Sequence, residues 1–140
     1  MRKKISKNDY YEIEIDTDKN RFYITHKRFW RNAAVAPNYL TEIQQALEKL
    51  KPGFTALQDN SKYTVVPQEV ASKLISRAEY LLQNAKPAHT AVVLPEDKVA
   101  RLVTQITSKI DPNASNSPHY FSSREQAEAW LDNLDKTENE

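Results

Sequence analysis

The 140-residue sequence has no cysteine and only one glycine, and these two shortages exclude several kinds of site. Without cysteine there is no disulfide framework, no thiolate metal site and no cysteine nucleophile, which fits a reducing compartment. A single glycine excludes the glycine-rich loops that hold nucleotide phosphates in Walker-type and dinucleotide-binding proteins. The sequence therefore predicts no cofactor of these kinds and no thiol chemistry.

A strong charge of one sign and a long apolar run are also missing. Twenty lysine and arginine residues face 19 aspartate and glutamate residues, so no global field draws the protein to nucleic acid, and we expect no nucleic-acid partner. The basic start, MRKKISKNDYYEIEI, has no apolar run of signal-peptide length behind it, and no later segment approaches a membrane span. We expect a cytoplasmic protein without a membrane partner.

The apolar pattern predicts an α/β fold. Residues 10–16 and 21–26 alternate apolar and polar side chains around the turn DTDKN, which predicts an antiparallel hairpin. Further buried strands and helices are then expected at 37–51 (helix), 54–58 (strand), 67–85 (helix), 89–94 (strand), 96–110 (helix), 119–121 (strand) and 122–134 (helix). This alternation implies right-handed crossovers. The predicted architecture is a mixed β-sheet opened by an antiparallel hairpin, then βαβ crossovers, with about four helices packed on it.

The length fits one hydrophobic core, which predicts a single domain. Residues 1–8 are polar and basic, and we expect them to be a flexible N-terminus. The domain is expected over residues 9–134, and residues 135–140, DKTENE, are expected to be a disordered tail. The strand YYEIEID is expected at an exposed sheet edge, which leaves a homodimer through that edge open.

Four phrases of the sequence together resemble one known family. They are DTDKNRFYIT, LEKLKPGFTALQD, TVVPQEVASKL and YFSSREQAEAWL. In this order they resemble the anti-sigma-factor antagonist domains, called STAS or SpoIIAA-like, and especially their divergent stand-alone bacterial members. The resemblance covers about residues 9–134. It implies a small regulatory or protein-interaction domain of signal transduction, without intrinsic catalysis.

The resemblance also points to the loop QDNSKYTVVP, residues 58–67. In the well-studied members, an aspartate at the strand end is followed by a phosphorylatable serine or threonine at the start of the next helix. Free N–H groups and the positive end of the helix dipole favour a phosphate there. Asp59 matches the aspartate, but VVP at residues 65–67 occupies the region of the acceptor, so the phosphoswitch motif is not matched.

Two interpretations of this loop stay open. Aspartate, asparagine and serine bond their own backbone and commonly turn a strand into a helix, so a plain turn explains residues 59–61. In the second interpretation the loop binds a partner, or one of its hydroxyl groups carries a phosphate. The residues of this expected partner-binding or phosphorylation loop are Asp59, Asn60, Ser61 and Thr64.

The segment HKRFWRN, from His26 to Asn32, mixes cationic and aromatic side chains. Such a mixture stacks on bases, holds an anion or docks on a protein partner. A large aromatic residue in a connection also commonly packs inward, which would place Trp30 in the core. The residues of this expected contact loop are Lys27, Arg28, Trp30 and Arg31.

No metal motif is complete. Asp16, Asp18 and Asn20 copy the first three ligand positions of an EF-hand calcium loop, but arginine follows where glycine is needed, and lysine stands where the final glutamate is needed. A hairpin turn explains these residues better. The histidines lack the paired spacing of zinc sites and are scattered, at His26, His89 and His119. We therefore predict no metal site.

Two functional hypotheses from different classes remain. The first is a non-enzymatic regulatory or protein-interaction domain that contacts a protein partner through the two expected loops. The second is a small-ligand or anion-binding protein with Arg28, Arg31 or a histidine in a cleft. A pocket lined by these residues favours the second hypothesis, whereas the first hypothesis predicts no well-formed polar pocket.

Overall fold

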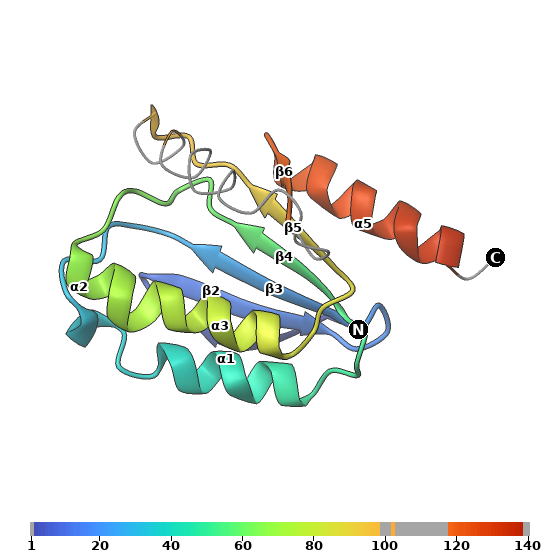
Figure 1. The fold of residues 1–140 in the computed structure, drawn as a ribbon, viewed down its shortest axis with the longest axis horizontal. Coiled ribbons are helices and arrows are strands. Elements are labelled where there is room, and N and C mark those ends of the chain that lie inside the picture. The colour runs from blue at the N-terminus through green and yellow to red at the C-terminus, as the bar shows by residue number, and fades with distance from the viewer. Residues whose placement is uncertain (1, 99–101, 103–117, 139–140) are drawn as a thin grey trace.

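Six strands form one mixed sheet, whose spatial order follows the chain from β1 to β6 (Figure 1). The structure is a computed structural model, and it describes residues 2–98, 102 and 118–138. The first three strands are antiparallel, whereas β3, β4, β5 and β6 run parallel. Their bounds are β1 Arg2–Lys7, β2 Tyr11–Asp16, β3 Arg21–His26, β4 Thr55–Asp59, β5 His89–Val93 and β6 His119–Phe121.

Helices cover both faces of the sheet. In Figure 1, α1 and α3 lie side by side on one face, and α5 lies on the opposite side, over the β5 and β6 end. The α1 helix connects β3 to β4, and a continuous helical segment connects β4 to β5, so both are crossovers between parallel strands. The helical bounds are α1 Tyr39–Glu48, α2 Gln68–Val70, a π-helical turn Ala71–Ile75, α3 Ser76–Asn84 and α5 Arg124–Glu138.

The predicted α/β architecture is confirmed, including the opening hairpin and the parallel section. The hairpin turn forms because the carboxylate of Asp16 accepts hydrogen bonds from the backbone N–H groups of Asp18 and Lys19, at 3.0 and 3.1 Å. Asn20 completes the turn in a left-handed conformation, with φ of 54°. Most of the helix expected at 96–110 lies outside the described residues.

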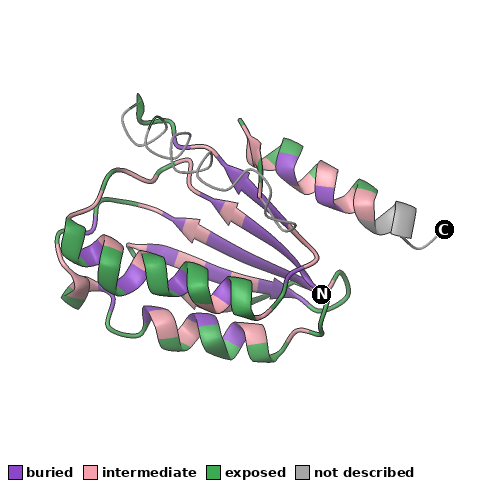
Figure 2. Ribbon diagram, in the orientation of Figure 1, coloured by how far each residue is buried: buried purple, intermediate pink, exposed green. Residues whose placement is uncertain are grey.

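Successive side chains of each strand point to opposite faces of the sheet, and this creates two separate cores, one on each face. Figure 2 shows the buried strands between helices whose outer sides are exposed. The larger core lies under α1 and α3 and includes alternate residues of β2 and β3. The smaller core lies under α5. Its buried residues are Tyr23, Leu57, Ala91, Val93, Ala127 and Leu131.

Three expectations about the ends and edges were wrong. Arg2–Lys7 is strand β1 and not a flexible tail, because these residues pair antiparallel with β2 and partly bury Ile5 against the larger core. Consequently YYEIEID is not a sheet edge. At the other end, α5 continues to Glu138, so the expected disordered tail is helical up to that residue.

Arg21 ties α5 to the sheet from inside the protein. Its side chain is fully buried, and its guanidinium donates to the Thr55 hydroxyl at 2.9 Å and to the Asp132 carboxylate at 2.8 Å. Glu128 lies on the same guanidinium at 3.6 Å and also accepts a hydrogen bond from the Tyr23 hydroxyl at 2.8 Å. A buried cation is tolerated here because its donors reach carboxylate and hydroxyl oxygens.

Replacement of the buried cation tests this connection. We expect Arg21→Met to lower the free energy of unfolding by about 2 kcal/mol, because the buried Thr55 hydroxyl loses its hydrogen-bond donor. The two carboxylates also lose their buried cation and keep only the partly exposed Lys19 and Arg2 as cationic partners among the described residues. The matched control is Arg2→Met, since Arg2 binds the same Glu128 at 2.9 Å but leaves 41% of its side chain exposed. We expect about 0.5 kcal/mol from the control. Equal losses in urea-unfolding measurements would contradict a special role for Arg21.

Candidate interaction surface

The two loops singled out in the sequence meet at one end of the sheet. β3 and β4 are adjacent and parallel, so residues 27–32 and 60–67 both leave the sheet at the carboxyl ends of these strands. Figure 1 shows the two connections running along the same side of the molecule, toward the start of α2. In open α/β sheets this end of the strands is where ligands and partners are commonly bound.

A buried histidine connects both loops to the first helix. His26, the last residue of β3, is 6% exposed. Its Nδ1–H donates to the side-chain oxygen of Asn60, at 2.7 Å, and its Nε2 accepts from the Tyr39 hydroxyl, at 2.8 Å. Since Asn60 follows β4 and Tyr39 begins α1, one imidazole ring holds three segments that are far apart in the sequence.

Burial keeps this histidine neutral. Removal of the ring from water lowers the pKa of His26 below its ordinary value, although the hydrogen bond that the ring donates to Asn60 and the negative charge of Asp59 oppose this shift. The neutral ring has one donor and one acceptor nitrogen, which the two partners require. Protonation would add an N–H at Nε2, and the Tyr39 hydroxyl would then have to turn and accept instead of donating. The neutral ring, which burial favours, fits both hydrogen bonds without this change.

Trp30 anchors the first loop in the core. It is 1% exposed, and its indole N–H donates to the backbone carbonyl of Tyr10 at 3.3 Å. Its ring makes edge contacts with Tyr39, with centroids 4.9 Å apart, and lies 5.8 Å from the ring of His26. Trp30 thus packs inward, as the alternative interpretation of its place in the sequence expects, and it is not available to a partner.

The neighbours of Trp30 point the other way. Phe29 is 50% exposed, which is unusual for a phenylalanine, and Arg28 and Arg31 on either side are exposed too. Arg28 lies over the ring of Tyr10, with its guanidinium carbon 5.8 Å from the ring centroid. Lys27 is less free than the two arginines because it binds the Glu12 carboxylate at 3.4 Å.

The second loop starts with a closed polar turn. The Asp59 carboxylate accepts from the backbone N–H of Ser61 at 3.1 Å and from the Ser61 hydroxyl at 2.7 Å. Its other oxygen lies 3.4 Å from the guanidinium of Arg124, at the start of α5. Asn60 is turned to the other side of the sheet, where it binds His26. The plain-turn interpretation therefore accounts for the contacts of Asp59 and Ser61, and Asn60 belongs to the buried connection.

Farther along, this loop exposes one apolar side chain. Val65 is 45% exposed, and it lies next to Thr64, whose hydroxyl oxygen is enclosed without a hydrogen-bond partner in the described part of the chain. Thus neither expected phosphoacceptor presents a free hydroxyl, since that of Ser61 is bound to Asp59. Phosphorylation of Ser61 or Thr64 stays a prediction. Of this loop, the residue that offers apolar contact area is Val65, which the sequence interpretation did not select.

Two shallow depressions lie beside the first loop. One, of about 430 Å³, is bordered by the β1–β2 turn, residues 35–38 and Glu42, which binds the Tyr11 hydroxyl. The other, of about 480 Å³, is lined by Lys7, Asn8, Asp9, Lys27 and Arg28. The second depression carries three cations. It joins Lys27 and Arg28, expected from the sequence, with Lys7, which was not expected.

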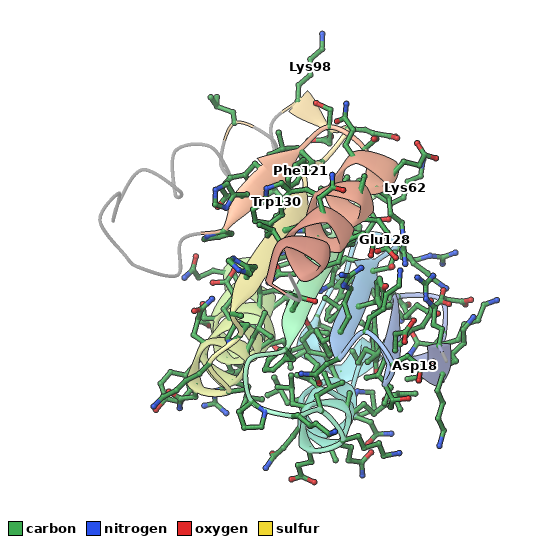
Figure 3. The ribbon with its side chains drawn as sticks, turned by 90° about the vertical axis from the view of Figure 1, so that its right-hand side faces the viewer. Asp18, Lys62, Lys98, Phe121, Glu128 and Trp130 are labelled. Carbon is green, nitrogen blue, oxygen red and sulfur yellow. The ribbon has the colours of Figure 1, made fainter. Side chains whose placement is uncertain are left out.

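The remaining histidines pack against an aromatic side chain. His89 and His119 contact the ring of Trp130, with ring centroids 5.9 and 4.5 Å away. Figure 3 shows Trp130, on α5, beside Phe121 of β6. Among the residues that the structure describes, no three histidine or acidic side chains are grouped to hold an ion. In the same residues no helix is long and apolar enough to cross a membrane.

The acid sensitivity of the buried connection provides a test. We expect the free energy of unfolding to fall as the pH drops below about 6.5, because the unfolded histidine then takes up a proton that buried His26 resists. His26→Gln should cost about 2 kcal/mol at pH 7.5 and remove much of this pH dependence. The control is His119→Gln, because His119 is exposed. This variant should keep the pH dependence of the free energy of unfolding. The free energy of unfolding of each variant is measured with urea at pH 7.5 and at pH 5.5. If His26→Gln lost as much stability between these two pH values as the unsubstituted protein does, the assignment would be contradicted.

Comparison with known proteins supports the fold alone. No family model matches the chain, and no curated protein matches it. Among solved structures it is similar to an uncharacterised protein of the DUF3478 family, with a SpoIIAA-like fold, from Shewanella loihica PV-4. The likeness covers 90% of this chain and 97% of that one, with a TM-score of 0.63 and 15% sequence identity. The chain therefore has the SpoIIAA-like fold that the resemblance in its sequence predicted.

Proposed function

We propose that this protein is a non-enzymatic regulatory domain that binds a protein partner through Phe29 and Val65. The observation that carries the proposal is Phe29, which is 50% exposed beside the buried Trp30. Phenylalanine ordinarily packs into the core, and exposed aromatic and arginine side chains, here Phe29 with Arg28 and Arg31, are enriched at protein interfaces. Val65 offers further apolar area on the neighbouring loop.

The base of this surface is held before any partner arrives. Trp30 fixes the first loop, and Asn60 fixes the second, because both are bound to the cluster around His26. A loop with a fixed base loses less conformational entropy on binding, so more of the contact energy remains as affinity. In this proposal Asp59 and Ser61 shape the loop, and the contact itself is made by its neighbours. A cytoplasmic location is part of the proposal.

Anion binding is the second candidate function, and the depression beside Lys7 favours it. Lys7, Lys27 and Arg28 line this depression of about 480 Å³. Its limits are also plain, since Asp9 lies in the same lining and Lys27 already binds Glu12 at 3.4 Å. The site is open, and water screens exposed charges. The protein-interaction proposal therefore stands first.

Photo-crosslinking in the native cells tests the first proposal. A benzophenone amino acid at position 29 or 65 should capture the same protein, because both positions would face one partner. Tyr80 is the matched control, since it is an aromatic residue that is 67% exposed and lies on α3, outside both loops in the sequence. Capture of the same protein with equal yield from position 80 would contradict a specific surface.

Affinity measurements with the captured protein then decide the role of each side chain. We expect Phe29→Ser to weaken binding by about tenfold or more, as for a buried aromatic anchor, and Val65→Ser to weaken it less. Tyr80→Ser should leave the affinity unchanged. Since Phe29 is half exposed, its replacement should also leave the melting temperature nearly unchanged. Full affinity in both loop variants would refute the proposed surface.

Thermal shift tests the anion candidate. If the depression is an anion site, inorganic phosphate or pyrophosphate should raise the melting temperature by several degrees at saturation. Lys7→Gln together with Arg28→Gln should abolish the shift, because these cations line the depression. The exposed pair Lys49→Gln and Lys51→Gln is the control of equal charge change. A shift that persists in the first pair would mean general charge screening.

A further inference from the structure

β1 leaves one edge of the sheet open. It is the outermost strand and pairs only with β2 among the strands that the structure describes. In Figure 3 the N-terminal strands, in blue, lie on the side of the molecule away from β6. Apart from the ladder to β2, the backbone of residues 2–7 makes no hydrogen bond with a described residue. The edge is thus a row of unpaired N–H and C=O groups, six residues long.

This edge is strongly cationic. Two of its cations are occupied, because Arg2 binds Glu128 at 2.9 Å and Lys4 binds Glu12. Lys3 and Lys7 are both exposed. Neither lysine forms an ion pair with another residue that the structure describes. The four cations of the six-residue strand are Arg2, Lys3, Lys4 and Lys7.

A β-bulge in β1 places Lys3 and Lys7 on different faces of the sheet. The register shifts between Lys4 and Ser6, so Lys3 lies opposite Ile15 and Lys7 lies opposite Glu12. Ile15 belongs to the core under α1, whereas Glu12 lies on the other face of β2. Lys3 and Lys7 therefore project on opposite faces of the sheet. A strand added to this edge would meet a positive charge on each of its faces.

The same charges reject a second copy of the chain. Antiparallel pairing of two β1 strands would bring the four cations of each copy together along one ladder. These like charges repel, and β1 contains no acidic side chain that could offset them. An acidic strand in the same place would instead face two lysines that lack partners. The charge on the edge thus selects against identical chains and for acidic ones.

We propose that the free edge of β1 binds an extended acidic segment of another protein, which adds to the sheet as a further strand. Main-chain hydrogen bonds supply the affinity in this mode of binding, and side chains supply the choice of partner. Acidic side chains of the segment meet Lys3 and Lys7. The depression lined by Lys7, Lys27 and Arg28 continues the positive surface beyond the end of β1. The proposal shares no residue with Phe29 and Val65, so either can fail without the other.

A designed peptide tests the edge directly. The probe is a capped extended peptide of glutamate, valine and threonine, EVETEVTE, titrated into the full chain while backbone amide exchange is followed by NMR. We expect saturable binding that weakens with added salt, together with slower exchange of amides within residues 2–7. The decisive control is the same peptide with alternate backbone nitrogens methylated, which keeps the charge but cannot complete a ladder.

Charge variants complete the test. Lys3→Glu with Lys7→Glu should weaken binding of EVETEVTE by about tenfold or more, while Lys49→Glu with Lys51→Glu, of equal net charge, should not. Both pairs are exposed, so circular dichroism should show an unchanged fold. Three results would overturn the proposal: no binding of the unmodified peptide at millimolar concentration, equal binding of the methylated peptide, or a dimer through β1 in sedimentation. In the first case the lysines only guard the edge against aggregation.

Discussion

The candidate surface depends on one hydrogen-bonded chain, from Asn60 through His26 to Tyr39. Without it, the connections after β3 and β4 would be two independent loops. With it, the imidazole ring fixes the start of α1 on one side and the end of β4 on the other. Because the ring is buried, each of these bonds is costly to lose, and the arrangement is correspondingly rigid. The shape of the candidate surface is therefore set by buried groups that do not themselves belong to the surface.

Two kinds of packing hold the two faces of the sheet. Under α1 and α3 the contacts are aromatic and aliphatic, around Trp30 and Tyr39. Under α5 a small apolar core is bordered by ion pairs around Arg21, which reach Glu128 and Asp132. Burial of a cation is expensive unless its partners are placed well. The position of α5 is thus specified by charge as well as by apolar area, and this helix also brings Arg124 to Asp59.

The sequence predicted the fold well, because hydrophobic period and turn residues are local signals. The hairpin, the parallel section and the helix after residue 122 all follow from such patterns. β1 was missed, since RKKISK contains a single large apolar residue and only its partner β2 makes it a strand. The roles of His26, Tyr39 and Arg124 could not be predicted, because their partners lie between 13 and 99 positions away. Spacing along the chain carries no information on such pairs.

The loop after β4 shows why the place of a site and its chemistry must be argued separately. The place is common to open α/β sheets, since the carboxyl ends of parallel strands meet there. The chemistry depends on which side chains remain free. Here the Asp59 carboxylate is bound to Ser61 and Arg124, and the hydroxyl of Thr64 is enclosed and does not reach solvent. Polar chemistry at this end is therefore largely satisfied within the protein. What remains free is apolar and cationic, in the side chains of Phe29, Val65 and the two exposed arginines, and such groups suit contact with a protein better than catalysis.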